Sequence, residues 1–157
     1  MPRWTWRDSK TNGGDCVVVD IDGVISDGHH RQHFLDGPKK RWKPFFDACG
    51  DDEVIADNVE RFLSDTSVTR VLLTSRPETI HDQTVTWLIA NAIGWDLLIM
   101  RSNHDHGPAP TMKRAAVQQL RADGFVIALA VDDDRRNIAM YADEGIATEY
   151  VHSGYRM

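Results

Sequence analysis

The chain of 157 residues lacks the features that mark disulfide-stapled, secreted and membrane-spanning proteins. Its only cysteines, Cys16 and Cys49, are too few for a disulfide framework, so we expect a reducing, cytoplasmic setting. No apolar run approaches the ~18 residues needed to span a bilayer. The N-terminal stretch "MPRWTWRDSKTNGGD" contains no apolar segment of the kind found in signal peptides.

An excess of basic residues is also missing. The net charge of −6 argues against a surface that coats nucleic acid broadly, although it allows a local basic groove. The one dense basic run is "KKRWK", Lys39–Lys43. A phosphate-binding loop of the form GxxxxGK[ST] is absent too, so we expect any kinase activity to be absent or encoded elsewhere.

No internal repeat, linker or low-complexity segment divides the sequence, and its length favours one domain. We expect a loose N-terminal arm over residues 1–15 and a single domain over residues 16–157. An insertion at about residues 23–50 is too short for a large closing lid, so we expect a minimal cap and a rather open site.

Apolar, β-branched runs without clean alternation predict strands that are covered on both faces, as in a parallel sheet. These runs are Cys16–Ile21, Val68–Ser75, Asp96–Met100 and Val126–Asp132, with a short fifth at Thr148–His152. Helical patterns separate them, at Asp51–Asp65, Thr79–Ile93, Thr111–Asp123 and Arg135–Glu144. Gly94, Gly124 and Gly145 each follow a helical pattern, where glycine allows a left-handed cap. The alternation predicts a doubly wound α/β fold with a parallel sheet of about five strands and helices on both faces.

Polar side chains follow the four longer runs. They are Asp20 and Asp22; Thr74, Ser75 and Arg76; Arg101, Ser102 and Asn103; and Asp132, Asp133 and Asp134. Ligands of such folds bind beyond the carboxyl ends of the strands, so we expect these side chains to form the active site.

Two acidic clusters at neighbouring strand ends would repel each other unless a hard cation such as Mg²⁺ lay between them. One carboxylate is then free to attack phosphorus, and another can protonate the leaving alkoxide and activate water. Thr74 can donate to a phosphoryl oxygen. Lys113, near the start of a helix after "GPAPT", can neutralise charge on the aspartate and the phosphoryl group.

These motifs resemble those of the haloacid dehalogenase superfamily. The matching stretches are "DIDG", "LLTSR", the helix-leading lysine and "VDDD", in the same order and over roughly Val17–Arg156. The resemblance implies that Asp20 is the nucleophile and Asp22 the general acid and base. It further implies that Thr74 binds phosphate, that Lys113 is the family's lysine, and that Mg²⁺ is held by Asp132, Asp133, Asp20 and, through its main-chain carbonyl, Asp22.

Looser patterns resemble the 3′-phosphatase domain of bacteriophage polynucleotide kinase/phosphatases. They are "TSRPE", "VDDDRRNIAMYADEGI", the ending "YVHSGYRM", and "HHRQHFL…RWKPFFDAC", in which Lys43 and Pro44 depart from relatives that carry an acidic residue. The resemblance implies a Mg²⁺-dependent phosphomonoesterase that removes 3′-phosphates from DNA or RNA ends, with a separate kinase or ligase as a possible partner. The alternatives are a nucleotidase or other small-molecule phosphatase, and a non-catalytic phosphate-binding module.

Several residues have both a functional and a plain interpretation. Ser75 and Arg76 are candidate phosphate contacts, while Lys39, Arg41 and Trp42 are candidates for a nucleic-acid contact or for an ordinary solvated loop. His29, His30 and His33 would suggest zinc, but no cysteine lies at ligand spacing, which disfavours it. Loop polarity suffices to explain His104 and His106, and Trp4 and Trp6 have no assigned role.

Overall fold

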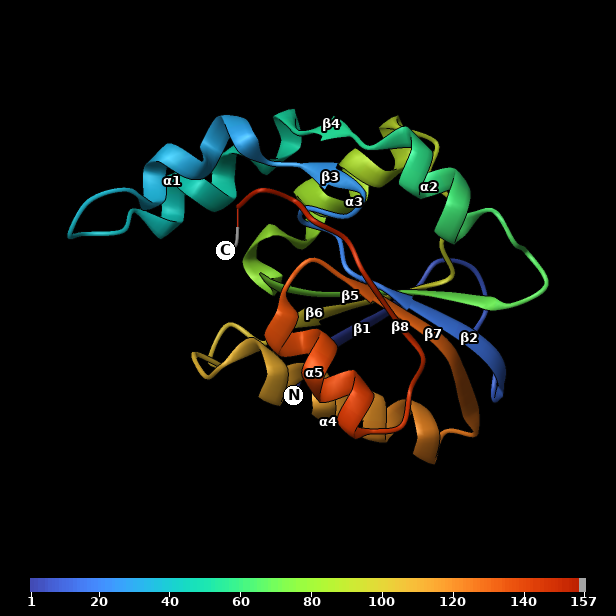
Figure 1. The fold of residues 1–157 in the computed structure, drawn as a ribbon. Helices are drawn as coiled ribbons and strands as arrows, with labels where there is room; N and C mark the ends of the chain where they lie inside the picture. Colours follow the sequence, from blue (N-terminus) through green and yellow to red (C-terminus); the bar gives the residue numbers. More distant parts are fainter. Residues whose placement is uncertain (156–157) are drawn as a thin grey trace.

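The computed structural model describes residues 1–155 and shows a mostly parallel sheet between two layers of helices (Figure 1). The six strands lie in the order β1-β6-β5-β2-β7-β8, and β1 is antiparallel to its neighbour β6. The strands of this sheet are β1 (Arg3–Trp6), β2 (Gly14–Val19), β5 (Thr69–Pro77), β6 (Leu97–Arg101), β7 (Phe125–Asp132) and β8 (Thr148–Tyr150). The doubly wound α/β architecture predicted from the sequence is confirmed.

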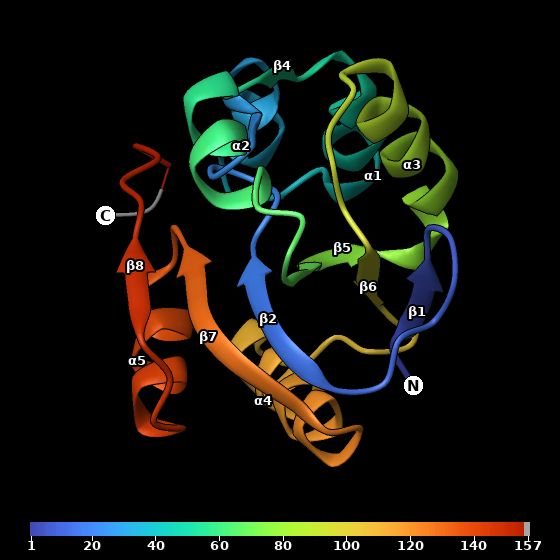
Figure 2. The ribbon, with the colours of Figure 1, turned by 90° about the vertical axis from the view of Figure 1, so that its right-hand side faces the viewer.

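Helices cover both faces of the sheet (Figure 2). On one face lie α4 (Ala109–Ala122) and α5 (Arg135–Asp143), and on the other lie α2 (Ala56–Leu63) and α3 (His81–Ala90), the latter preceded by the short η3 (Glu78–Ile80). Each layer has its own core: Val117 and Tyr141 are buried in the first, and Leu63 and Leu88 in the second. Among residues 1–155, none of the helices is long and apolar enough to cross a membrane.

The N-terminal residues form a strand in place of the expected loose arm. Trp4 pairs with Ile99 and Trp6 with Leu97, so β1 adds a sixth, antiparallel strand to the expected five. Both tryptophans pack against the core beneath α4, and the ring of Trp6 stacks at 6.2 Å on that of Phe125. Burial of these two rings on one face of the sheet is the physical reason that the segment is ordered.

The insertion forms a small cap over the carboxyl ends of the strands. Its elements are β3 (Ser26–Asp27), η1 (His29–Leu35), α1 (Trp42–Asp47), η2 (Ala48–Asp51) and β4 (Glu53–Val54). Because β4 pairs with β3, the helix expected over residues 51–65 begins only at Ala56. The turn into the cap requires glycine at Gly23, whose φ is +81° and whose Cβ, if present, would lie 2.3 Å from Asp133 Oδ2.

Of the three glycines expected to end helices in a left-handed conformation, two do so. Gly124 and Gly145 adopt positive φ values of 93° and 75° after α4 and α5, as expected for left-handed caps. Gly94 does not, because the left-handed residue after α3 is Ala92, with a φ of 52°. Arg156 and Met157, which end both the expected domain and the "YVHSGYRM" stretch, lie outside the described residues.

Candidate active site

Three buried aspartates meet at the ends of the two central strands. Val19 of β2 pairs with Val131 of β7, so the residues that follow them, Asp20 and Asp132, lie side by side at the carboxyl edge of the sheet. One carboxylate oxygen each from Asp20, Asp132 and Asp133 lies within 4.8 Å of the others, and all three residues are buried. Among the described residues, this is the one group of acidic, histidine or cysteine side chains with metal-ligand geometry.

Lys113 supplies positive charge to this group from the first turns of α4. Its Nζ lies 2.7 Å from Asp132 Oδ2 and 3.1 Å from Asp20 Oδ1, and the lysine is 1% exposed. Its neighbour Arg114, the alternative cation, instead pairs at 3.0 Å with Asp143, the last residue of α5. The structure therefore places Lys113, and not Arg114, beside the three aspartates.

Burial is the main cause of the unusual electrostatics at Asp20. Desolvation and the nearby Asp132 raise the pKa of Asp20 well above its usual range, while Lys113 partly opposes them. For Lys113, burial alone would lower the pKa, but Asp132 and Asp20 raise it, so the lysine stays charged. A cation bound among the three carboxylates would add to the positive charge that Lys113 supplies.

Asp22 lies apart from the three-carboxylate group and is held by two arginines. Arg76 approaches both of its oxygens, with Nη2 2.8 Å from Oδ1 and Nε 3.0 Å from Oδ2, and Arg31 Nη2 also donates to Oδ1. Burial would raise the pKa of Asp22, but Arg76 and Arg31 together lower it below its usual range. The side chain of Asp22 is therefore not part of the three-carboxylate group. Its main-chain carbonyl is the atom that the family resemblance implies as a Mg²⁺ ligand.

Arg76 was expected to bind substrate phosphate directly, but the structure places its guanidinium beneath the site. The residue is 1% exposed, and Nη1 donates to Thr84 Oγ1 at 3.1 Å. Its Nε and Nη2, the guanidinium nitrogens expected to bind phosphate, instead donate to Asp22. Arg76 fixes Asp22 in place, and its edge still lines the cavity above.

Sequence reasoning missed the second half of this network, which Arg31 and Asp52 form. Arg31 is fully buried in η1, its Nε donates to Asp52 Oδ1 at 2.9 Å, and its guanidinium lies over the ring of Phe45. Asp52 in turn accepts from Ser26 Oγ. In the sequence, Arg31 lies in "HHRQH" and Asp52 in "GDDE". Both stretches are typical of a solvated loop, so neither indicates a buried ion pair.

The three histidines of the cap have separate partners. His30 contacts Asp52 at 2.7 Å and His29 contacts Asp27 at 2.7 Å, whereas the ring of His33 packs on Phe34. The three rings are thus held by different neighbours within the cap.

Thr74 and Ser75 end the straight part of β5 at the floor of the site. Thr74 is 1% exposed and its Oγ1 accepts a hydrogen bond from the backbone N–H of Arg76 at 3.1 Å. Ser75 is half-buried and lines the open cavity. The hydroxyl hydrogen of Thr74 is not used by that bond and can be donated to a phosphoryl oxygen.

Above Asp22 opens a cavity of ≈ 460 Å³. Its basic lining residues are Lys40, Arg76, Arg101 and Arg136, and its aromatic ones are Trp42, Phe45, Phe46 and Tyr155. We refer to it as the phosphate mouth. Of the candidate nucleic-acid contacts from the basic run, Trp42 lines it, whereas Arg41 lies over the ring of Phe34 and Lys39 is exposed beyond it.

The C-terminal segment closes one side of the phosphate mouth. Tyr155 OH donates to Asp27 Oδ1 at 3.0 Å and accepts from the backbone N–H of Gly28 at 2.6 Å. Its ring also meets the edge of the His29 ring. The end of the described chain is thereby fastened to the beginning of the cap, an arrangement that sequence reasoning missed.

Solved structures with the same fold include two chains from Pnkp1/Rnl/Hen1 complexes, one of them titled an RNA repair complex. Each is 19% identical to this chain, with TM-scores of 0.72 and 0.71. The match covers 94% of this chain but only 45% and 49% of theirs, so the chain spans about half of their length. A HAD-like phosphatase from Mesorhizobium loti is 12% identical with a TM-score of 0.58, over 93% of this chain and 77% of the other.

Among curated proteins, the sequence has no match. The family model described as the polynucleotide kinase PNKP phosphatase domain matches residues 14–155. That range contains the three-carboxylate group, Lys113, Asp22 with its two arginines, and the whole cap. The chain therefore belongs to the family of the PNKP phosphatase domain, and it is a phosphatase of the HAD type.

Proposed function

We propose that this phosphatase removes the 3′-phosphate from DNA or RNA ends in a Mg²⁺-dependent reaction through an aspartyl-phosphate. The observation that carries the proposal is the combination of a buried acidic site with a mouth lined by cations and aromatic rings. Cations suit a nucleic-acid backbone, and exposed rings suit an unpaired base. The Pnkp1 neighbour's place in an RNA repair complex supports the same substrate class.

The three-carboxylate group fits Mg²⁺. Its donors are all hard oxygens within 4.8 Å of one another, and all three residues are buried. Asp20, Asp132 and Asp133 would hold the ion, together with the main-chain carbonyl of Asp22. When bound, the ion supplies positive charge that stabilises the phosphoryl oxygens as the reaction proceeds.

In the first step, Asp20 attacks phosphorus, its carboxylate oxygen forming the new O–P bond while the bond to the 3′-oxygen breaks. The leaving oxygen takes a proton from Asp22 and departs as the 3′-hydroxyl. In the second step, Asp22 accepts a proton from water, which attacks phosphorus and regenerates Asp20 as inorganic phosphate leaves. Lys113 and Thr74 stabilise the charge on the reacting oxygens throughout.

The two arginines around Asp22 bear on its proton transfer. In the absence of substrate they lower the pKa of Asp22, so it is a carboxylate at neutral pH. An entering phosphate brings negative charge to the same region, which raises the pKa of a neighbouring carboxyl and offsets the arginines. Asp22 would thus gain its proton as the substrate binds.

Asp22→Asn is expected to lower kcat by ~10²–10⁴-fold, because the amide cannot shuttle a proton. The loss should be smallest for an aryl phosphate, whose phenolate leaving group needs little protonation. Measuring kcat for an aryl phosphate and for a 3′-phosphorylated oligonucleotide compares the two. Equal losses on both substrates would contradict the acid role of Asp22.

Phosphate release from four matched substrates tests the proposed function. They are an oligonucleotide with a 3′-phosphate, the same oligonucleotide with a 5′-phosphate, and free 3′- and 5′-mononucleotides. The proposal predicts the highest kcat/KM for the 3′-phosphorylated oligonucleotide. Faster hydrolysis of mononucleotides would favour a nucleotidase, and no hydrolysis of any phosphate ester would favour a binding module.

Replacing Lys39, Lys40 and Arg41 with alanine is expected to weaken oligonucleotide binding and reduce its salt dependence. Each lost phosphate contact lowers the number of counterions released, by about 0.7 for a single strand. Since Lys40 is the member that lines the phosphate mouth, Lys40→Ala alone should account for most of the change. The measurement is KM for a 3′-phosphorylated oligonucleotide at several salt concentrations.

Lys43→Ala is the matched control for this basic run. Lys43 is highly exposed and pairs with Asp47 within α1, away from the phosphate mouth. Its KM and salt slope should equal those of the wild type. If the triple variant has the same salt slope as the wild type, the basic run is an ordinary solvated loop that does not contact the oligonucleotide.

A further inference from the structure

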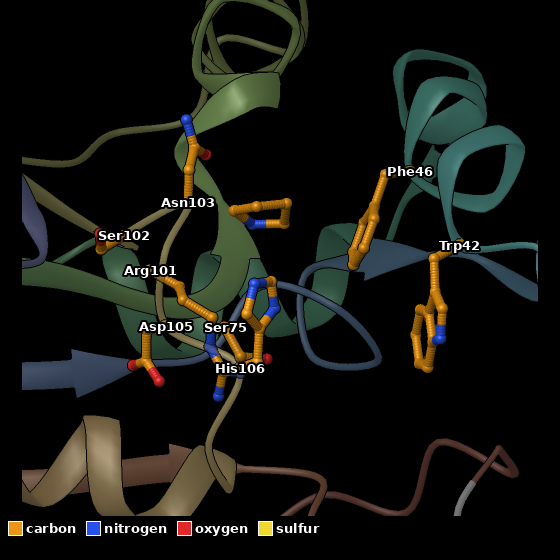
Figure 3. Close-up of a pocket in the computed structure, with 9 residues that line it drawn as sticks. Trp42, Phe46, Ser75, Arg101, Ser102, Asn103, Asp105 and His106 are labelled. Atoms are coloured by element: carbon orange, nitrogen blue, oxygen red, sulfur yellow. The ribbon is translucent and has the colours of Figure 1, made fainter.

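A second cavity, of ≈ 470 Å³, lies beside the phosphate mouth between α1 and the loop at residues 102–107 (Figure 3). The two cavities share Trp42, Phe46, Ser75 and Arg101 in their linings. They are therefore adjacent, and a ligand with its phosphate in the phosphate mouth can extend past these residues into the second cavity. Its volume falls within the range of about 300–1,000 Å³ that is typical of small-ligand sites.

The walls of the side cavity combine ring faces with polar edges. Figure 3 shows Phe46 and Trp42 on the α1 side and His106 across from them, on the loop. The rings of Trp42 and Phe46 are stacked, with centroids 5.8 Å apart, and Trp42 is 50% exposed. A flat group entering between α1 and the loop would have a ring on either side of it.

The polar side of the cavity comes from the loop itself. Asn103 Oδ1 accepts from the backbone N–H of Thr79 at 3.0 Å, and Asp105 Oδ1 accepts from that of Gly107 at 2.9 Å. These bonds fix both side chains at the rim and leave the Asn103 amide N–H₂ and the second Asp105 oxygen for a ligand. Rings on the flat sides with donors and acceptors at the rim match the chemistry of a nucleobase.

Arg101 connects the two cavities. Its Nη1 donates to the carbonyl of Gly107 at 2.9 Å, but its Nε is buried and has no hydrogen-bond partner among residues 1–155. A buried donor without a partner is costly in a folded protein. Because Nε is buried, a ligand that spans both cavities would contact Arg101 through the outer, Nη side of its guanidinium.

We propose that the side cavity binds the base of the terminal nucleotide, between Phe46 and His106, while its 3′-phosphate occupies the phosphate mouth. The inference rests on the proposed function and adds to it the residues that bind the terminal base of the strand. Stacking tolerates every base, so the subsite favours the presence of a base over its absence.

The test compares a 3′-phosphorylated oligonucleotide with one that lacks only the terminal base, a stable abasic analogue. For the wild-type protein, kcat/KM should be roughly 5- to 150-fold higher when the base is present, which is the range that stacking of one base on an aromatic ring supports. His106→Ala and Phe46→Leu should each shrink this ratio. Leucine at position 46 keeps apolar volume against the core. A smaller ratio for Phe46→Leu would therefore be due to loss of the aromatic ring as a stacking surface.

His104→Ala is the matched control, since it changes an exposed histidine of the same loop that does not line the cavity. It should keep the wild-type ratio. A wild-type ratio near one, with efficient removal of both 3′-phosphates, would overturn the base subsite and leave the proposed function standing. Equal ratios in all variants would overturn the assignment to these residues. Failure to hydrolyse either oligonucleotide, with aryl phosphate still cleaved, would overturn both proposals.

Discussion

Asp20→Asn is expected to leave no measurable turnover, a loss on the order of 10⁴-fold or more, because a neutral amide cannot attack phosphorus. The substitution is nearly isosteric and removes a charge that the fold disfavours, since burial and Asp132 raise the pKa of Asp20. The variant should therefore fold as well as the wild type, and the measurement is kcat beside the thermal midpoint.

The control for this substitution is Asp36→Asn, which neutralises an exposed aspartate of the cap. It should retain wild-type kcat and the wild-type thermal midpoint. A rate for Asp20→Asn above about one-hundredth of the wild-type rate would contradict the assignment of Asp20 as the nucleophile.

Removal of divalent cations should also abolish turnover, and Mg²⁺ should restore it. The buried carboxylates of Asp20, Asp132 and Asp133 offer hard oxygen ligands at one point, and a cation held there would offset their repulsion of an incoming phosphate. Because only the folded site binds the ion, Mg²⁺ should also raise the thermal midpoint. Full activity after exhaustive chelation would contradict the metal dependence.

A pair of neighbouring variants locates the ion. Asp133→Asn removes one oxygen ligand and should strongly reduce the stabilisation by Mg²⁺. Asp134→Asn should preserve it, because Asp134 lies outside the three-carboxylate group and asparagine can still cap α5. Equal stabilisation of both variants would place the ion elsewhere.

The central strands and the acidic site were predictable because local sequence determines them. Apolar runs such as Val126–Asp132 are long enough to specify a buried strand, and the side chain after each run must emerge at the same edge of the sheet. That rule brings Asp20 beside Asp132. Lys113 was singled out by its resemblance to the family's lysine, and the fold of α4 brings its Nζ to 2.7 Å from Asp132 Oδ2.

What sequence reasoning missed depends on contacts between distant residues. Arg31 and Asp52 become buried partners only when the cap folds over β5, and either alone resembles a surface charge. The β1 strand is different, because Trp4 and Trp6 show the two-residue period of a strand in the sequence itself. With only four residues, however, it needs β6 as a partner to be recognised.

The structure of the protein with Mg²⁺ and beryllofluoride, a mimic of the phosphoryl group, tests the central claim most directly. The account predicts beryllium bonded to a carboxylate oxygen of Asp20 and the cation held among Asp20, Asp132 and Asp133. Beryllofluoride on any other residue, or a cation outside these three carboxylates, would contradict it.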